Sequence, residues 1–362
     1  MTAPLQPRPA VDKMQPYALS RADVPDGVAP ILLNQNESPL PPSPLAIEAA
    51  ARAAERAHRY SDPDWRELRA AIAEVHQLDP ESILVGAGSM ELIGAAVAAY
   101  AGPGDEVLSS EHGYAFFRTA AERAQARYVA APEPGKTVSV EAILDCVTDA
   151  TRIVCVANPG NPTGTRIGRP DIVRLRERMP ANALLILDEA YGEFADDLGE
   201  PMFDLARRGD TIVLRTFSKA YALAGMRVGW GAFGGDLAVQ TRKLLNPNNV
   251  SAVSQSAAAA AMRDQAYMRD LCRSTTAARE AFSASCRAIG LDTTASFTNF
   301  VLVGFGSADR AVRADRALRE NGIVMRPMGF YGLGDCLRAT VGNTEEMKRT
   351  AEVLGAFMAK EQ

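Results

Sequence analysis

A lysine within RTFSKAYALAGMRVGW, residues 215–230, is the residue best placed for nucleophilic chemistry. An apolar strand leads into Thr216, Ser218 and Lys219, and small residues then lead on to Arg227. A lysine in a tight turn beside buried strands tends to lose its charge, because burial disfavours the ammonium form. The neutral amine is a nucleophile suited to forming a Schiff base. The guanidinium of Arg227 offers a rigid fork that can bind an anion.

Two further segments place polar residues directly after apolar strands. In LLILDEAYGEF, residues 184–194, an aliphatic run ends at Asp188, and Tyr191 follows three residues later. A carboxylate at the end of a buried strand needs a charged or hydrogen-bonding partner, and a cationic ring nitrogen would supply one. In VANPGNPTGT, residues 156–165, asparagine, proline and glycine form a stiff loop. Open α/β sheets bind ligands at such strand ends, although each segment alone is also compatible with an ordinary turn.

A fourth segment, ILVGAGSMELI at 83–93, has the order strand, glycine-rich turn and helix. Free backbone N–H groups at the start of a helix form an anion site that suits phosphate. The four segments together supply an amine, a carboxylate, an amide donor and a phosphate cradle. Pyridoxal 5′-phosphate needs this set, because its aldehyde, ring nitrogen, phenolic oxygen and phosphate each require a partner.

The elements that must position these residues alternate between strand and helix from residue 82 to residue 233. This alternation is typical of a mostly parallel sheet with helices on both faces. The strands are nearly continuous apolar runs, as expected for strands that are buried on both faces. We expect strands over 82–85, 106–109, 152–157, 184–187, 212–216 and 228–233, and helices over 45–56, 65–76, 89–100, 115–126 and 169–179.

The pattern changes after about residue 250, where a smaller α+β region begins. We expect a long alanine-rich helical run within 251–288, strands over 300–304, 323–326 and 336–341, and helices over 307–321 and 344–360. The predicted parts are an N-terminal arm (1–44), a large α/β domain (45–255) and a small α+β domain (256–362). Ten of the 22 prolines lie in the arm, which should prevent a packed helix there. We expect the arm to pack with the small domain or with a partner subunit.

Composition excludes several other classes of function. The 362 residues include 39 Lys+Arg and 44 Asp+Glu, and the net charge of −5 argues against nucleic acid or an anionic membrane as the main partner. No apolar run reaches the roughly 18 residues of a transmembrane helix. The N-terminus lacks the apolar core of a signal peptide, so we expect a cytoplasmic protein. The 5 cysteines show no C-x-x-C spacing and only 3 histidines occur, so we expect no metal site.

The combination of NPGNPTG, DEAY and SKAYALAGMRVGW resembles the fold-type I, class I/II aminotransferases. Weaker motifs indicate the histidinol-phosphate aminotransferase branch, namely LNQNESP at 33–39, RYSDPDW at 59–65, GAGSMELI at 86–93 and RPMGFYGLGDCLRATVG at 326–342. The resemblance runs almost from end to end. It implies a mostly parallel seven-stranded sheet in the large domain, pyridoxal 5′-phosphate as cofactor and a homodimer.

The resemblance also implies a role for individual residues. Lys219 bonds covalently to the cofactor and then moves protons, and Asp188 pairs with the pyridine nitrogen. Asn161 and Tyr191 bind the phenolic oxygen. The remaining implied contacts are those of Tyr114, which stacks on the ring; of Gly88, Ser89, Ser218 and Arg227, which hold the phosphate; of Tyr60, which reaches the phosphate in the partner subunit; and of Arg338, Arg326 and Asn36, which bind the substrate. We also expect the Asn161–Pro162 peptide bond to be cis.

The sequence departs from the usual pattern of the branch at three places, with Ala87 and Met90 in GAGSME, Gly160 in NPGNPTG and Ser38 in NESP. Ser38 lies towards the substrate side, so this departure bears on the substrate and not on the type of reaction. The implied reaction is a ping-pong transamination between an amino donor and a keto acceptor. Aromatic aminotransferases and threonine-phosphate decarboxylases share the cofactor residues and remain alternatives. A non-catalytic cofactor-sensing module would need an additional domain.

Overall fold

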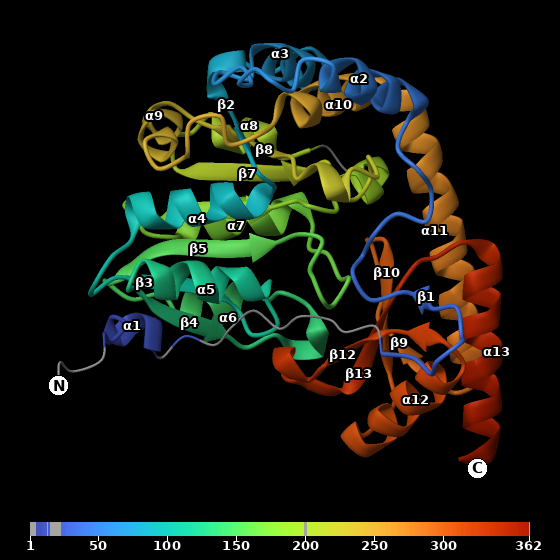
Figure 1. The fold of residues 1–362 in the computed structure, drawn as a ribbon. Helices are drawn as coiled ribbons and strands as arrows, with labels where there is room; N and C mark the ends of the chain where they lie inside the picture. The colour runs from blue at the N-terminus through green and yellow to red at the C-terminus, as the bar shows by residue number, and fades with distance from the viewer. Residues whose placement is uncertain (1–4, 13, 15–22, 199–200, 362) are drawn as a thin grey trace.

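The structure, a computed structural model of the chain, describes residues 5–12, 14, 23–198 and 201–361. A seven-stranded sheet forms the centre of its larger part, with helices packed over it (Figure 1). The strand order is β2-β8-β7-β6-β5-β3-β4. These strands are β2 (Ile83–Gly86), β3 (Glu106–Ser110), β4 (Arg127–Ala131), β5 (Thr151–Ala157), β6 (Leu184–Asp188), β7 (Thr211–Thr216) and β8 (Gly229–Phe233).

Neighbouring strands of this sheet run parallel except at β8, which is antiparallel to both β2 and β7. The mostly parallel seven-stranded sheet predicted from the sequence is therefore confirmed. Strands β2, β3, β6, β7 and β8 are buried along their whole length, because helices cover both faces. The helices of this part are α2 (Pro44–Ala54), α3 (Arg66–His76), α4 (Ser89–Tyr100), α5 (Ala115–Arg123), α6 (Val140–Asp145), α7 (Arg169–Arg178), α8 (Phe203–Ala206), α9 (Asp236–Arg242) and α10 (Ala252–Arg263).

The smaller part contains a four-stranded sheet in the order β12-β13-β10-β9, with antiparallel pairing throughout. The second hydrophobic core of the molecule lies between this sheet and three helices. The elements are β9 (Asp292–Thr293), β10 (Phe300–Gly304), β12 (Arg326–Met328), β13 (Leu333–Thr340), α11 (Gln265–Ala288), α12 (Ala308–Glu320) and α13 (Thr344–Lys360).

The predicted arm contacts both parts: α1 (Pro9–Asp12) lies beside α5 of the larger part, and the segment from Ile31 joins the smaller part (Figure 1). Strand β1 (Ile31–Leu32) pairs in parallel with β11 (Ile323–Val324), and Leu33 is buried in the second core. Contrary to the prediction, the arm contains a one-turn helix, α1 (Pro9–Asp12). Proline is tolerated there because the first turn of a helix needs no N–H donor. Residues 1–4, 13 and 15–22 of the predicted arm lie outside the described residues.

The helical run predicted within 251–288 is confirmed, but it is divided into two helices, α10 and α11, by a break at Asp264 that was not predicted. Asp264 interrupts it with φ −90° and ψ 62°, and its side chain accepts a hydrogen bond from the backbone N–H of Tyr267. An aspartate at this position caps the new helix α11, which explains why the alanine-rich pattern does not continue as one helix. Within α11, Met268, Leu271 and Cys272 pack in the core of the larger part, whereas Phe282 and Cys286 pack in the second core. The two cores therefore divide within α11.

Candidate active site

The predicted residues other than Tyr60 meet at the carboxyl ends of β5, β6 and β7, on the side of the sheet that faces the smaller part. A cavity of about 180 Å³ opens there. A second cavity of about 320 Å³ adjoins it and shares Gln35, Ser89, Tyr114 and Lys219 with the first. The first cavity is lined by Gln35, Asn36, Ser89, Tyr114, Ala157, Pro159, Asn161, Asp188, Tyr191, Lys219, Arg326, Tyr331 and Arg338.

Lys219 follows β7 and points its amine into both cavities. Its Nζ donates hydrogen bonds to the main-chain oxygens of Asn36 at 2.9 Å and Gln35 at 3.4 Å. Burial, together with the positive charges of Arg338 and Arg227, lowers the pKa of this lysine to about 7. The direction of this change agrees with the sequence-based expectation, since an appreciable fraction of the amine is neutral near pH 7.

Asp188 ends β6 and lines the first cavity with its carboxylate. Its Oδ1 accepts a hydrogen bond from the backbone N–H of Ala190 at 3.2 Å. Burial raises the pKa of this carboxyl to about 7, and the negative charge of Glu189 contributes to the rise. Among the described residues Asp188 has no basic partner in an ion pair, so a cationic ring nitrogen in the cavity would supply the charge that its ionised form needs.

Tyr191 and Asn161 face the same cavity from the loops after β6 and β5. The Tyr191 hydroxyl accepts a hydrogen bond from the side-chain amide of Asn36 at 2.7 Å. Burial raises the pKa of this phenol. The Asn161 side-chain oxygen accepts a hydrogen bond from Arg338 at 2.6 Å. The Asn161–Pro162 peptide bond is cis, as predicted, and Asn158–Pro159 is cis as well.

The predicted phosphate-binding residues line the second cavity together. Gly88 has φ +82°, and a Cβ there would lie 2.6 Å from the Arg227 guanidinium, so glycine is required. Arg227 itself adopts φ 56° and points towards the Ser218 hydroxyl, at 3.4 Å. With Ser89 opening α4, these groups combine a helix N-terminus, a hydroxyl and a guanidinium around one space. Such a group of donors binds a phosphate.

A side-chain network that the sequence did not reveal supports the turn before α4. Glu91 accepts hydrogen bonds from the backbone N–H of Ala87 and from the side chain of Asn249, both at 2.7 Å. Asn249 also donates to the Val85 oxygen and accepts from the indole N–H of Trp65. The Ala87 N–H is thereby satisfied within the protein, and the Gly88 N–H donates to the Gly86 oxygen at 2.7 Å, so the backbone donors that remain for an anion begin at Ser89.

The opposite wall of the first cavity carries Arg338, Arg326 and Asn36, the three residues expected to bind substrate. Arg338 projects from β13, is buried, and also donates to the Asn34 oxygen at 3.2 Å. Asn36 has φ 54°, and its backbone N–H donates to the Thr340 hydroxyl. Its contacts with Lys219 and Tyr191 show that Asn36 holds two catalytic candidates as well as lining the cavity.

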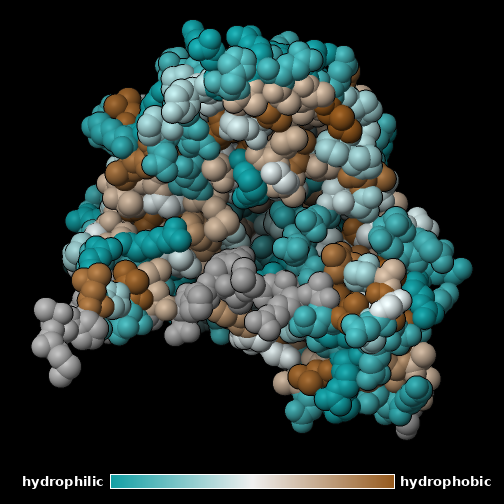
Figure 2. Space-filling view, in the orientation of Figure 1, coloured by the Kyte–Doolittle hydropathy of each residue, from teal (hydrophilic) through white to brown (hydrophobic). Residues whose placement is uncertain are grey.

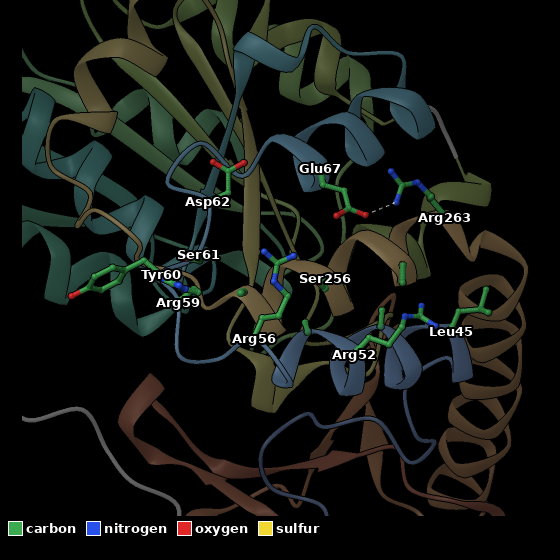
Figure 3. Close-up of a pocket in the computed structure, with 14 residues that line it drawn as sticks. Leu45, Arg52, Arg56, Arg59, Tyr60, Ser61, Asp62, Glu67, Ser256 and Arg263 are labelled. Carbon is green, nitrogen blue, oxygen red and sulfur yellow. Dashed lines mark hydrogen bonds and ion pairs between the residues drawn. The ribbon is translucent and has the colours of Figure 1, made fainter.

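Tyr60 does not reach this cavity within its own chain. Its side chain is 91% exposed and lines a separate groove of about 650 Å³ between α2 and α10 (Figure 3). Four arginines line the same groove, and the phenol points away from them (Figure 3). The arginines are Arg52, Arg56, Arg59 and Arg263.

Sequence reasoning missed two residues of the cavity wall that face Lys219. Tyr331 lies on the short helical turn η6 (Gly329–Tyr331), and Gln35 precedes Asn36. An aromatic residue between glycines, in a segment that already contained Arg326, was the available signal for Tyr331. The described residues contain no group of acidic, histidine or cysteine side chains arranged to hold a metal ion.

The residues present fit pyridoxal 5′-phosphate. The cavity places an amine of lowered pKa and a buried carboxylate at the ends of neighbouring strands, and the adjoining cavity provides an anion cradle that a Cβ at Gly88 would fill. This arrangement can bind an aldehyde covalently, keep a ring nitrogen protonated and hold a phosphate. Across the described ranges, no helix has the length and apolar character required to cross a membrane.

Comparisons with known proteins agree with this geometry. The sequence profile of the family "Aminotransferase class I and II" matches residues 29–354. The chain is 39% identical over 360 residues to a histidinol-phosphate aminotransferase of Jannaschia sp., covering 99% of this chain and 100% of that protein. It is 42% identical to another of Paramagnetospirillum magneticum, covering 99% of each.

A solved structure is similar over the whole length. The histidinol-phosphate aminotransferase of Sinorhizobium meliloti in complex with pyridoxal-5′-phosphate has a TM-score of 0.91 and 28% sequence identity, covering 100% of both chains. A profile match over most of the chain and full-length relatives near 40% identity lead to one assignment. The chain belongs to the class I and II aminotransferases, in their histidinol-phosphate aminotransferase branch.

Proposed function

We propose that this enzyme is a pyridoxal 5′-phosphate-dependent aminotransferase that converts L-histidinol phosphate and 2-oxoglutarate to imidazole acetol phosphate and glutamate. The observation that carries the proposal is one cavity that contains Lys219, Asp188 and two arginines, Arg326 and Arg338. The first two residues meet the needs of the cofactor. The two guanidinium groups meet the needs of a substrate that bears an anion beside the reacting amine.

The bound cofactor supplies an electron sink for the negative charge that develops at the substrate α-carbon. Asp188 would keep the ring nitrogen protonated, because the buried carboxylate is stable in its ionised form only beside a cationic partner. With the cofactor bound, the Lys219 amine would accept and return the proton of the substrate α-carbon, and its lowered pKa suits this role near neutral pH. Asn161, Tyr191 and Tyr114 line the same cavity and would hold the ring of the cofactor there.

The arginines account for two substrates of different shape in one site. Histidinol phosphate presents a phosphate ester and glutamate presents carboxylates, and a guanidinium fork fits either anion. Arg338 is buried, and its guanidinium carbon lies 5.2 Å from the centroid of the Phe300 ring. This contact with Phe300 helps to fix the position of the guanidinium group. Arg326 lies opposite Arg338 in the β12–β13 pairing, so the two charges enter the cavity from neighbouring strands.

The test is a half-reaction screen with the purified enzyme. Each amino donor is added alone, and conversion of the cofactor to its amine form is followed by absorbance. We expect histidinol phosphate and glutamate to convert the cofactor. Conversion by aromatic amino acids and not by histidinol phosphate would favour an aromatic aminotransferase. Release of carbon dioxide from threonine phosphate would favour a decarboxylase. No conversion by any amine would contradict an enzymatic function.

We further propose a homodimer in which Tyr60 completes the phosphate site of the partner subunit. The exposed phenol of Tyr60 does not reach the active-site cavity of its own chain. The groove that Tyr60 lines is also lined by the exposed Leu45 of α2 (Figure 3). In the alternative, Tyr60 acts only within its own chain. The homodimer and the cytoplasmic location stay predictions from the sequence.

A subunit-mixing experiment tests the shared site. Tyr60→Phe protein and Lys219→Ala protein are combined under conditions that exchange subunits. One site of the hybrid then carries both lesions and the other carries neither, because the two sites are related by two-fold symmetry. We expect the intact site to regain wild-type cofactor affinity. A monomer in sedimentation, or no regained site after proven exchange, would contradict the shared site.

A further inference from the structure

The loop after β3 belongs to the larger part and the turn η6 to the smaller part, but the two meet beside the active-site cavity. The loop, residues 111–114, contains His112 and ends at Tyr114. The turn contains Tyr331. His112 Nδ1 lies 2.8 Å from the main-chain oxygen of Tyr331, a contact between residues 219 positions apart. The side chains of Tyr114 and Tyr331 line the same cavity as Lys219.

The direction of this hydrogen bond follows from its partners. A carbonyl oxygen only accepts, so the proton must be on Nδ1 of the imidazole. The His112 ring is therefore a donor in this contact. Because Tyr331 is held through its backbone, the side chain of Tyr331 remains directed at the cavity.

His112 is itself fixed by the larger part. It is buried, and its backbone N–H donates to Glu133 Oε2 at 3.1 Å. The next residue, Gly113, has no room for a side chain, because a Cβ would lie 2.6 Å from the Ser109 hydroxyl. On the side of η6, a Cβ added to Gly332 would come into van der Waals contact with the ring, 3.9 Å from its Cε1. The ring is thus a rigid donor that the loop presents to the turn.

A second contact joins the same two regions nearby. Lys136, three residues after Glu133, places its Nζ 3.7 Å from Cys336 Sγ on β13. The segment around Glu133 therefore touches the smaller part directly and through His112. Both contacts lie near Arg326 and Arg338, which belong to the wall expected to bind substrate.

We propose that His112 is a positioning residue, which fixes Tyr331 on the substrate side of the cavity through its Nδ1–H···O hydrogen bond and thereby sets the affinity for the amino substrate. The inference rests on the proposed function, because that function identifies the wall of Tyr331, Arg326 and Arg338 as the substrate side. His112 does not touch the reacting atoms. Its effect should therefore appear in substrate binding, while cofactor binding and the chemical step are retained.

The test compares His112→Leu with His112→Asn in the holoenzyme. Asparagine keeps an N–H donor close to the position of Nδ1, whereas leucine fills the space without a donor. We expect His112→Leu to raise the KM for the amino substrate by roughly three- to tenfold, the range that corresponds to one hydrogen bond. The kcat should stay within about twofold, as expected when ground-state and transition-state binding are weakened equally. His112→Asn should restore the KM, and the exposed His58→Leu should leave it unchanged.

Three other measurements separate positioning from a general loss of structure. The cofactor dissociation constant of His112→Leu should equal that of the wild type. If the leucine variant does not fold, His112→Gln replaces it, because glutamine carries its donor one bond further from the backbone and should not restore the KM. Imidazole ¹⁵N NMR of the wild-type holoenzyme should show a proton on Nδ1 of His112, assigned by its loss in His112→Asn.

The inference would be overturned by a proton on Nε2 alone, by equal KM values for the leucine and asparagine variants, or by a parallel loss of cofactor affinity. Failure of the proposed function has a different signature, since the wild type itself would not turn over histidinol phosphate. The KM comparison is then made with the amino donor that the wild type accepts, and the NMR measurement needs no substrate.

Discussion

The wall of the cavity that holds Lys219 and Asp188 comes from the ends of neighbouring strands in one sheet, whereas the opposite wall collects residues from three separated segments. The first wall, called the sheet-derived wall below, is rigid because β5, β6 and β7 are hydrogen-bonded to one another and lie in the core. The second wall, called the assembled wall below, joins Gln35 and Asn36 of the arm, Arg326 and Tyr331, and Arg338. The difference suggests that the sheet fixes the chemistry, and that the assembled wall sets which substrate is used.

Lys219→Ala gives the largest expected effect on the sheet-derived wall. Removing the amine removes both the covalent partner of the cofactor and the proton carrier, so we expect kcat to fall by at least about 10⁴-fold. The measurement is steady-state transamination. Lys243→Ala removes an exposed lysine of the larger part and serves as the control, with activity unchanged. Comparable activity in the two variants would show that Lys219 takes no part in the reaction.

Asp188→Asn should lower kcat by about 10²-fold or more, because a neutral ring stabilises the developing charge poorly. The cofactor should remain bound through Lys219 and the phosphate cradle, which absorbance titration measures. A variant with nearly normal kcat would show that Asp188 does not support the ring nitrogen.

The same variant tests the burial of Asp188 in the cofactor-free protein. The folded-state pKa is raised from 3.8 to about 7, so the folded state keeps a proton that the unfolded chain releases between about pH 4 and pH 7. The contribution of this group to stability is therefore lost as pH rises through that window. Thermal unfolding at pH 8 should give a higher Tm for Asp188→Asn than for the wild type. A lower Tm would indicate that a partner stabilises the ionised carboxylate.

Arg338→Lys tests the assembled wall. A lysine is a point charge and cannot reproduce the planar fork that contacts Asn161 and Asn34. We expect the KM for both the amino donor and the keto acceptor to rise by roughly 10- to 100-fold, the range for hydrogen bonds to a charged group. Cofactor affinity should change little. An equal loss of cofactor affinity would show that the two walls cannot be separated.

The pH dependence of cofactor binding gives the smallest expected effect. The pKa of Lys219 is lowered to about 7, so the nucleophilic amine forms as pH rises through 7. The rate at which the cofactor-free protein bonds to pyridoxal 5′-phosphate should rise up to about pH 7 and then level off. A free alkylamine, measured in parallel, corrects for titration of the cofactor. A corrected rate that still climbs at pH 9 would indicate an ordinary lysine.

The sheet-derived wall could be predicted from the sequence because each of its residues follows an apolar run along the chain. The carboxyl ends of parallel strands meet at one edge, so local pattern was sufficient to bring Asp188, Asn161 and Lys219 together. The edge strand β4 was missed, since it is partly exposed and lacks a continuous apolar run. The break at Asp264 was missed because alanine-rich sequence continues as helix on both sides.

The assembled wall was only partly predictable. Arg338 and Arg326 were found through a resemblance, but no spacing in the sequence connects Tyr331 with His112, or Asn36 with Lys219. Those contacts depend on how the smaller part packs against the larger one. The Tyr60 groove has the same origin, since α2 and α10 are about 200 residues apart and meet only in the fold, as non-local contacts do.

The most direct test of the account is to locate the cofactor on the chain. The purified enzyme, loaded with pyridoxal 5′-phosphate, is reduced with borohydride, digested and analysed by mass spectrometry. The reduced cofactor should be attached to the peptide containing Ser218 and Lys219, and excess amino substrate added before reduction should prevent the attachment. Attachment at another lysine, or no attachment in an active enzyme, would contradict it.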